Sequence, residues 1–445
     1  MSALGRATSD TFRSLRTRNF RLFFGGQLIS QVGNWLTMVA QTLLVLRLTG
    51  SGVALGLLAA CQFAPLLVLG PWAGLVADRS DKRKLLLIVQ SIAMLQSFAL
   101  AGLAFMGDPP LAGIFAISLV GGLTVAFDNP ARRSFVVEMV PERDMNNAVS
   151  LNSALMTSSR IIGPALAGLL VSTVGFGWAF LADGLSYIAV LAALGMMRTA
   201  ELRPAPVTPR AKGQVRAGFR YVRSVPDLWV PMVMMAVMGV FAFNFAVVFP
   251  LFVTQDLGGS DTAFTILFSI VSVGSLVGAL AMARRRSIDV HIVAVTALAF
   301  GVPMLVMAVV PNLALACAVG IFIGFGSIAF LTSSTAIVQT RADPMMRGRV
   351  LALQGMVFLG STPVGGPILG WICEAYGARW GIVVGGAACL VAGAWGLVMV
   401  RRCERERLDR AQADESVVEA IAEMGGAGVG VADLEPPTPD LVDRR

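Results

Sequence analysis

The sequence is short of charge for its length, and this scarcity bounds what the chain can be. Charged residues make up 14% of its 445 residues, whereas soluble domains carry roughly 25%. Hydrophobic residues make up 56%, so the chain lacks the polar side chains that would cover a soluble surface. These proportions predict an integral membrane protein whose main surroundings are the lipid bilayer.

Residues that carry catalytic or metal chemistry are scarce as well. The chain has one histidine, His291, and five scattered cysteines without paired spacing, which argues against hydrolytic, zinc and disulfide chemistry. It also has no Gly-x4-Gly-Lys-Ser/Thr loop, which excludes nucleotide hydrolysis through a P-loop. We therefore predict a protein that is not an enzyme and holds no metal and no cofactor.

What the chain has in abundance is long apolar runs. A membrane-spanning helix needs about 20 apolar residues, and a lipid-exposed segment must satisfy its own backbone hydrogen bonds, so each such run predicts a helix. Twelve runs qualify, at 21–46, 53–77, 85–106, 111–130, 147–173, 177–198, 229–254, 262–283, 291–310, 313–336, 349–373 and 380–400.

The basic residues predict the orientation. With both termini cytoplasmic, all but three of the 35 Lys and Arg fall on the cytoplasmic side, as the positive-inside rule requires. Arg47 and Arg379 are on the opposite face, and Arg160 lies inside a span. The net charge of +8 thus belongs to cytoplasmic loops, and we expect no nucleic-acid partner because no soluble domain is present to bind one.

An internal repeat divides the chain into halves. Five residue pairs are each separated by 203 positions, and secondary transporters use two halves related by a parallel repeat with a site near the midplane between them. We predict an all-α membrane protein of twelve transmembrane helices in two pseudo-symmetric six-helix bundles. The pairs are Gly121/Gly324, Phe127/Phe330, Pro141/Pro344, Gly163/Gly366 and Pro164/Pro367.

The repeat and the composition predict four regions. Residues 1–198 form the first bundle, and residues 227–402 form the second. Between them, 199–226 is a cytoplasmic linker whose Pro-rich start is extended and whose later part, around Phe219, is a short amphipathic helix on the membrane surface. Residues 403–445 are predicted to be a disordered cytoplasmic tail.

Four carboxamides form a stripe on the first span. Gln27, Gln31, Asn34 and Gln41 fall within an arc of ~80° at 100° per residue, and facing lipid would be costly for them. The stripe either lines a central cavity or holds the bundle together by interhelical hydrogen bonds. On the first interpretation Asn244 in the seventh span is its counterpart across the cavity.

Few charges lie inside the spans. Asp128 is at the inner end of the fourth span, Arg160 is roughly 15–20 Å into the fifth, and Asp183 is in the outer third of the sixth. Buried ionisable groups in membranes are candidates for function, and the two carboxylates can carry protons whereas the arginine cannot. The alternative is static ion pairs that fix helix packing.

Two Gly-Pro steps recur at matching places in the halves. Proline removes a backbone donor and bends a helix, while glycine lets a neighbour approach closely. Gly163-Pro164 and Gly366-Pro367 are therefore candidate bending points for alternating access, although both residue types are common in membrane helices.

The loop between the second and third spans carries a recognisable motif. A small residue, an acid-base pair and a basic cluster follow one another, as Gly74, Asp78, Arg79, Lys82 and Arg83. This order resembles the signature loop of the major facilitator superfamily, with Asp81 where a glycine is usual. The segments 128–141, 147–152 and 160–168 resemble the bacterial branch that contains the enterobactin exporter and related drug-efflux proteins.

The resemblance implies a latch on the cytoplasmic side that forms when the site faces out. In it Asp78 would sit near the N-terminus of the eleventh helix, where the dipole favours a negative charge, and Arg79 would pair with Asp128. The second half has Met282 where the acid of the equivalent loop would be, before Arg284-Arg-Arg286. The fourth span as predicted also lacks the membrane arginine common in proton-coupled members of the family.

These observations predict a proton-coupled exporter of amphipathic small molecules, such as drugs or siderophores, in the bacterial cytoplasmic membrane. The resemblance implies alternating access by rocking of the two halves, and we expect a monomer. An uptake symporter, a lysophospholipid flippase and a transporter-like sensor that moves nothing are the alternatives.

Overall fold

The computed structural model describes residues 12–203, 214–285 and 287–425. Over these ranges it contains twelve helical segments that are long and apolar enough to cross a membrane, and it contains no strand. The predicted all-α fold with twelve spans is therefore confirmed, and the chain is a multi-pass membrane protein.

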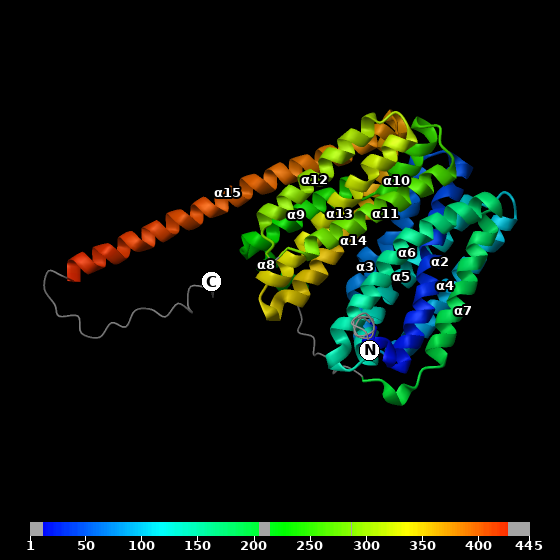
Figure 1. Cartoon of the computed structure of the whole chain (residues 1–445), viewed down its shortest axis with the longest axis horizontal. Coiled ribbons are helices and arrows are strands. Elements are labelled where there is room, and N and C mark those ends of the chain that lie inside the picture. Colours follow the sequence, from blue (N-terminus) through cyan, green and yellow to red (C-terminus); the bar gives the residue numbers. More distant parts are fainter. Residues whose placement is uncertain (1–11, 204–213, 286, 426–445) are drawn as a thin grey trace, which may run out of the picture. The chain divides into compact units, whose positions relative to one another are not determined.

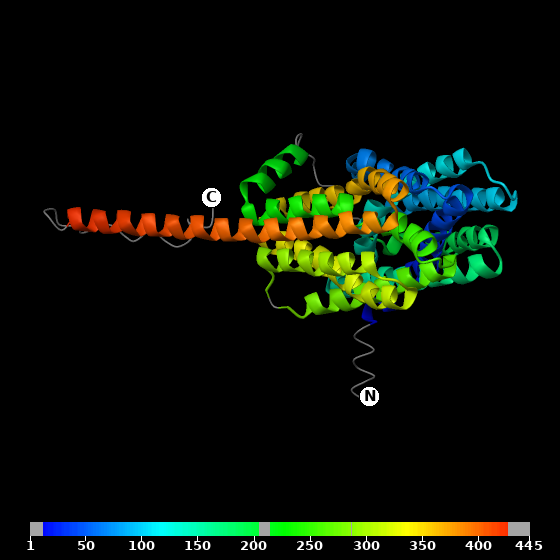
Figure 2. The same cartoon turned by 90° about the horizontal axis from the view of Figure 1, so that it is seen from above.

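The first six spans are single helices. Figure 1 shows them grouped on one side of the part that contains both sets of spans, with α8–α14 on the other, and Figure 2 shows the same two groups in a turned view. They are α2 (Arg18–Thr49), α3 (Gly52–Arg79), α4 (Lys82–Phe105), α5 (Leu111–Met139), α6 (Met145–Thr173) and α7 (Phe176–Gly195).

The second half begins with an interrupted span. The seventh span consists of α9 (Pro226–Phe241), α10 (Phe245–Leu251) and a π-helical turn over Phe252–Asp256. The remaining spans are α11 (Asp261–Ala283), α12 (Val290–Val309), α13 (Leu313–Arg341), α14 (Pro344–Tyr376) and the first part of α15 (Ala378–Gly425).

The fourth span is longer than predicted. It was expected to end at residue 130, but α5 continues through Pro130 to Met139. Proline is tolerated inside membrane helices where the surrounding structure compensates for the missing backbone donor. This extension brings two arginines, 132 and 133, into the helix.

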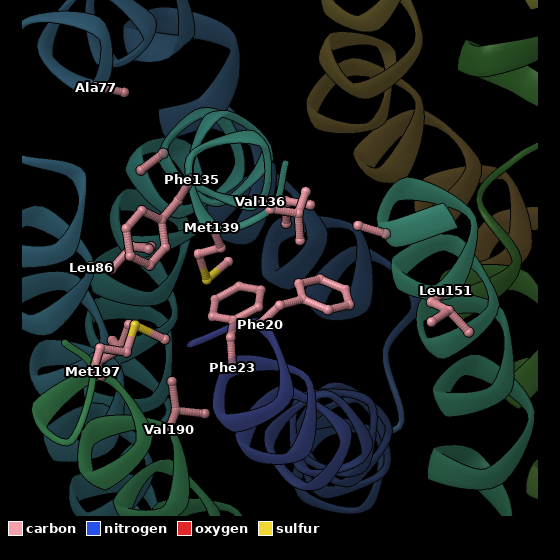
Figure 3. Close-up of a cluster of buried hydrophobic side chains, with 14 residues drawn as sticks. Phe20, Phe23, Ala77, Leu86, Phe135, Val136, Met139, Leu151, Val190 and Met197 are labelled. Carbon is pink, nitrogen blue, oxygen red and sulfur yellow. The ribbon is translucent and has the colours of Figure 1, made fainter. Parts of the chain in front are cut away.

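A hydrophobic cluster explains why α5 continues past its proline. Ala131, Phe135 and Met139 recur every four residues and are all buried, which places them on one face of the helix. The Phe135 ring meets Phe23 of α2 edge to face, with ring centres 6.0 Å apart, and Phe20 completes the contact from α2 (Figure 3). Tertiary packing therefore overrides the helix-breaking tendency of Pro130.

The two halves meet along two helix pairs, α3 with α14 and α6 with α11. Glycines allow the first approach, because a Cβ at Gly56 would lie only 2.6 Å from the Cα of Pro367. Close backbone contact through small residues is the usual way for membrane helices to associate. The twelve spans up to Gly396 accordingly form one compact unit.

The residues after Gly396 form a second compact unit. The tail from 403 was predicted to be disordered, but the described part of it, up to Gly425, is helical and continues α15. The reason is local: 401–422 consists mainly of Arg, Glu, Ala and Leu, which are strong helix formers, with opposite charges spaced to interact along the helix. Residues 426–445 lie outside the described ranges.

The linker contains the predicted short helix, α8 (Gln214–Ser224). Val222 is buried, while Phe219, Arg220 and Arg223 are exposed. The Tyr221 hydroxyl accepts a hydrogen bond of 2.9 Å from the backbone N–H of Asp343 and so ties α8 to the start of α14. The Pro-rich segment expected to be extended, 204–213, lies outside the described residues.

Candidate functional site

A cavity of about 420 Å³ lies almost wholly within the first half. Its lining comes from α2, α3, α4, α5, α6 and α7, and Leu359 of α14 is the contribution from the second half. The lining mixes carboxamides and hydroxyls with large apolar side chains such as Trp35, Phe63 and Met38. A concave site of this mixed character is the usual setting for an amphipathic small molecule.

Three of the four carboxamides of the first span line this cavity, namely Gln31, Asn34 and Gln41. Gln27 is buried, and its side-chain oxygen accepts a hydrogen bond from Arg132. Asn244 is not among the lining residues. It sits in the break between α9 and α10, where its amide donates to the Val240 carbonyl at 2.8 Å and replaces a backbone bond that the interruption removes.

The cavity-lining amides form a directed chain of hydrogen bonds. Tyr187 donates to the side-chain oxygen of Asn34 at 2.6 Å, and Asn34 donates to that of Gln31 at 3.2 Å. Gln31 then donates to the sulfur of Met156 at 2.9 Å. A thioether is a weak acceptor, so the last donor of the chain is available to a substrate oxygen that accepts more strongly.

A buried ion pair occupies the inner end of α5. Arg132 and Asp128, one helical turn apart, are both buried and form a salt bridge. Gln90 of α4 donates to the other carboxylate oxygen of Asp128 at 2.7 Å. All three side chains line the cavity.

Arg132 is a candidate functional residue that the sequence analysis did not predict. The predicted end of the fourth span at 130 placed it in a loop, and the conclusion that this span lacks a membrane arginine was wrong. The signal was present in the Asp-x3-Arg spacing, which puts an acid and a base on one helix face. This spacing has no meaning if the helix is assumed to end at Pro130, because Arg132 then lies in a loop.

Asp183 on α7 is the other charged group of the first half that lines the cavity. It is 1% exposed and accepts hydrogen bonds from Thr37 at 2.7 Å, from Ser97 at 2.8 Å and from Ser186 at 3.4 Å. Among the described residues no salt bridge reaches it.

Arg160 lies away from the cavity. Its guanidinium is directed at α11, where the nearest hydrogen-bond partner is the Ser275 hydroxyl at 3.4 Å. The structure therefore separates the three charges predicted inside the spans. Asp128 and Asp183 face one cavity, and Arg160 lies at the contact between the halves.

The predicted latch is not formed in this structure. Asp78 and Arg79 are exposed, and neither has an ion pair or hydrogen bond within the described part of the chain. Asp128 is occupied by Arg132, and the N-terminus of α14 is capped by its own Asp343, which accepts from the backbone N–H of Met345 at 2.7 Å. The latch stays a prediction for a conformation in which the signature-loop end closes.

The other residues of the signature loop serve the first half itself. Lys82 forms a buried ion pair of 2.6 Å with Glu138 of α5, and Arg83 donates to the Leu194 carbonyl at the end of α7 at 2.7 Å. Gly74 has open space where a Cβ would be. In the second half Met282 is buried at the end of α11, and residue 286 lies outside the described ranges.

The two Gly-Pro steps lie within continuous helices, α6 and α14. A Cβ at Gly163 would collide with Trp35 of α2, and Gly366 packs on Gly56 of α3. Both glycines therefore allow close helix contacts, and their role as bending points remains a prediction.

The halves are joined at the end that carries the loop between α2 and α3. There Arg47 pairs with Asp261 at 2.5 Å, and Gln255 donates to the Gly50 carbonyl at 3.1 Å. Glu374 of α14 accepts from the Ser51 hydroxyl and from the backbone N–H of Val53 at the start of α3. On the predicted orientation this is the outer side of the membrane.

No group of three or more His, Cys, Asp or Glu is arranged to hold a metal ion within the described ranges. Twelve spans in two joined halves, with a cavity lined almost wholly by the first half, are typical of a membrane transporter of the secondary-transporter kind. Residues 9–429 match the transmembrane secretion effector family of the major facilitator superfamily. The chain belongs to this family, and it is not an enzyme.

Curated relatives with similar sequences are transporters named for siderophores or drugs. The staphyloferrin A transporter of Staphylococcus aureus is 24% identical, over 77% of this chain and 87% of that protein. Macrolide efflux protein A of Streptococcus pyogenes is 22% identical over 78% and 87%. The multidrug efflux pump Tap of Mycolicibacterium fortuitum is 27% identical over 79% and 88%.

Solved structures show the same fold. A bacterial homologue of the human lysosomal transporter Spinster, in an inward-facing and unoccupied conformation, has a TM-score of 0.71 at 15% identity, covering 87% of this chain and 97% of that one. The nucleoside transporter NupG has a TM-score of 0.68 at 14% identity, covering 86% and 99%.

Proposed function

We propose that the protein is a proton-coupled exporter of amphipathic small molecules in the bacterial cytoplasmic membrane, working by alternating access. The observation that carries this proposal is the cavity of the first half. It joins a hydrogen-bonding amide chain and two carboxylates to aromatic and methionine side chains, so it suits molecules that are partly polar and partly apolar. The names of two relatives, macrolide efflux protein A and multidrug efflux pump Tap, support export.

The contacts between the halves support alternating access. The end predicted to face outward is closed by the Arg47–Asp261 pair and by Glu374 of α14, which accepts hydrogen bonds from the start of α3. Asp78 and Arg79 at the opposite end are exposed. We infer an arrangement that admits substrate from the cytoplasm. Breaking the outer contacts and forming the latch would then expose the cavity to the outside.

The carboxylates supply the coupling. Asp128 is neutralised by Arg132, whereas Asp183 has hydroxyl donors but no salt bridge among the described residues. A buried carboxylate without a counter-charge is a candidate for gaining and losing a proton during the transport cycle. We assign Asp183 as the proton carrier, with Asp128 as the alternative.

The test is transport in everted membrane vesicles, with an acid interior and a fluorescent amphipathic dye. The wild type is expected to accumulate the dye, and a protonophore is expected to abolish this accumulation. Asp183→Asn should remove the dependence on pH while leaving membrane abundance similar. Asp108→Asn, in an exposed loop, is the matched control and should behave as the wild type.

Two results would contradict the proposal, and a third would reassign the proton carrier. Accumulation in right-side-out vesicles that depends on the proton gradient would indicate uptake. Unchanged fluxes in Asp183→Asn, Arg132→Thr and Asp78→Asn would indicate a protein that does not transport. Retained pH dependence in Asp183→Asn would move the proton to Asp128.

A further inference from the structure

The side chains around Asp183 form a compact set of oxygen atoms from three helices. Thr37 comes from α2, Ser97 from α4, and Ser186 from α7 itself, and all three hydroxyls contact the carboxylate. We propose that this set is a binding site for a small monovalent cation, Na⁺, which competes there with the proton. The inference rests on the proposed function and extends it to the identity of the coupling ion.

The charge balance of the cavity supports a bound cation. The charged side chains that line it are Asp128, Arg132 and Asp183. Arg132 pairs with Asp128, so among the described residues Asp183 has hydroxyl donors but no positively charged partner. An unpaired charge buried in a membrane protein is costly, and such groups take a proton, a partner or an ion.

The helices packed against α7 are α2, α4 and α6, and none of them offers Asp183 a cation. Arg160, the charged residue of α6, is directed at Ser275 of α11. α2 presents Thr37 and Gly33 to the carboxylate, and α4 presents Ser97. The other titratable group on α7 in the cavity is Tyr187, whose hydroxyl is committed to Asn34. Within the described residues, the group that neutralises Asp183 must therefore come from outside the chain.

The ligand atoms indicate which ion fits. Carboxylate and hydroxyl oxygens are hard donors that suit hard cations, whereas imidazole and thiolate ligands, which favour transition metals, are missing from this set. One carboxylate balances one positive charge. A divalent ion would leave an excess charge in a medium of low dielectric constant, so the set selects a monovalent ion.

The space around the carboxylate indicates the size of the ion. Asp183 is 1% exposed, and Gly33 of α2 supplies the room for it, because a Cβ there would run into the carboxylate and lie 2.7 Å from the Ser186 hydroxyl. This close enclosure favours a small ion such as Na⁺ over an organic ammonium group, and because Na⁺ and the proton neutralise the same carboxylate they compete for it.

The test uses the purified full-length protein in detergent. Its thermal unfolding midpoint is measured at mildly alkaline pH against NaCl, with KCl and choline chloride at equal ionic strength. A ligand that binds the folded state stabilises it as RT ln(1 + [L]/Kd), so the midpoint should rise with Na⁺ and rise little with the other salts. At acid pH the proton should weaken the Na⁺ effect.

The variants locate the site. Asp183→Asn should lose the Na⁺-specific rise, and Thr37→Val and Ser97→Ala should each weaken Na⁺ affinity by about 10–100-fold. The matched controls are Ser272→Ala, a buried serine of α11 that bonds its own helix, and the exposed Asp108→Asn. Both should keep the wild-type response.

The inference is overturned if the wild type shows no Na⁺-specific shift, which needs no variant to fold, or if Asp183→Asn keeps the shift. An Na⁺ effect that is equal at acid and alkaline pH would also overturn it, because competition would then be absent. Proton-driven export without Na⁺ binding would refute this site and leave the proposed function standing. Na⁺ binding without export of any compound would support this site and refute the proposed function.

Discussion

The two halves share a fold but differ in what they bury. Every buried charged side chain in the described part of the chain belongs to the first half, and these are Lys82, Asp128, Arg132, Glu138, Asp144 and Asp183. The second half buries none of its described charges and packs phenylalanines around Phe243 instead. Repeated architecture therefore does not imply repeated chemistry.

The repeat shows where the difference arises. Positions 203 residues beyond Asp128 and Arg132 are Leu331 and Thr335 on α13. An ion pair in one half thus corresponds to an apolar and a weakly polar residue in the other. On the proposed function, the first half would carry binding and coupling, and the second half would supply the more apolar partner.

The largest effect on stability and export is expected when Asp128 and Arg132 are replaced by the residue types at the matching positions of the second half. Arg132→Thr alone leaves Asp128 buried and unpaired, which should lower the free energy of unfolding by about 3–5 kcal/mol and abolish export. Adding Asp128→Leu should recover most of the stability but no export. Denaturant unfolding in mixed micelles and dye export in vesicles measure the two quantities.

Two outcomes would contradict this functional difference between the halves. If the single variant is as stable as the wild type, the pair does not hold the first half together. If the double variant exports normally, the ion pair is structural packing and the functional asymmetry between the halves is lost.

The next effect concerns substrate choice. Gln31→Ala and Asn34→Ala each remove a cavity hydrogen bond worth about 0.5–1.5 kcal/mol, so the ratio of export rates between two substrates should change by about 2–10-fold. The control is Gln354→Ala in the second half, a buried amide bonded to Ser334, which should leave the ratio unchanged. Equal losses for all substrates would indicate misfolding instead of altered recognition.

A smaller effect is expected at the signature loop. Asp78→Asn removes the charge that would meet the N-terminus of α14, an interaction of about 0.3–1 kcal/mol, so transport should fall about two- to fivefold at similar membrane abundance. Asp81→Ala in the same loop is the comparison, because Asp81 caps α4 by accepting from the backbone N–H of Lys84 and alanine cannot cap a helix. It should lower stability more than transport, and normal flux in Asp78→Asn would count against the latch.

The smallest effect is expected at the outer contact. Arg47→Gln removes a half-exposed ion pair with Asp261, worth about 0–1 kcal/mol, and should shift the balance between conformations by up to about fivefold. Cysteine labelling of the cavity from the outside measures that balance. Arg198→Gln, whose ion pair with Glu201 stays within the first half, should leave the labelling unchanged.

The sequence was sufficient for the number and order of the spans because length and hydropathy are local properties. It was also sufficient for the stripe on α2, where helical periodicity places Gln31, Asn34 and Gln41 on one face. It failed at Pro130, where contacts between Phe135 and Phe23, far apart in the chain, decide that the helix continues. It could not place Asn244 or Arg160 relative to the cavity, because those positions depend on how helices pack.

The same limit explains the surroundings of Asp183. Thr37, Ser97 and Ser186 are ordinary residues in their own helices, and nothing in their spacing connects them. They become one set when α2, α4 and α7 pack together, with Gly33 leaving the space between them. Composition can flag a lone carboxylate in a span, but three-dimensional packing is needed to find its neighbours.

The outer contact at Glu374 has a consequence for how often the protein can cycle. Ser51 donates to Glu374 and at the same time accepts from the backbone N–H of Ala54, which caps its own helix. When the halves part, Ser51 keeps that cap, and water at this exposed end can replace Glu374. Opening therefore does not leave the Ser51 hydroxyl without a hydrogen-bond partner. This contact between the halves can break and re-form in every transport cycle.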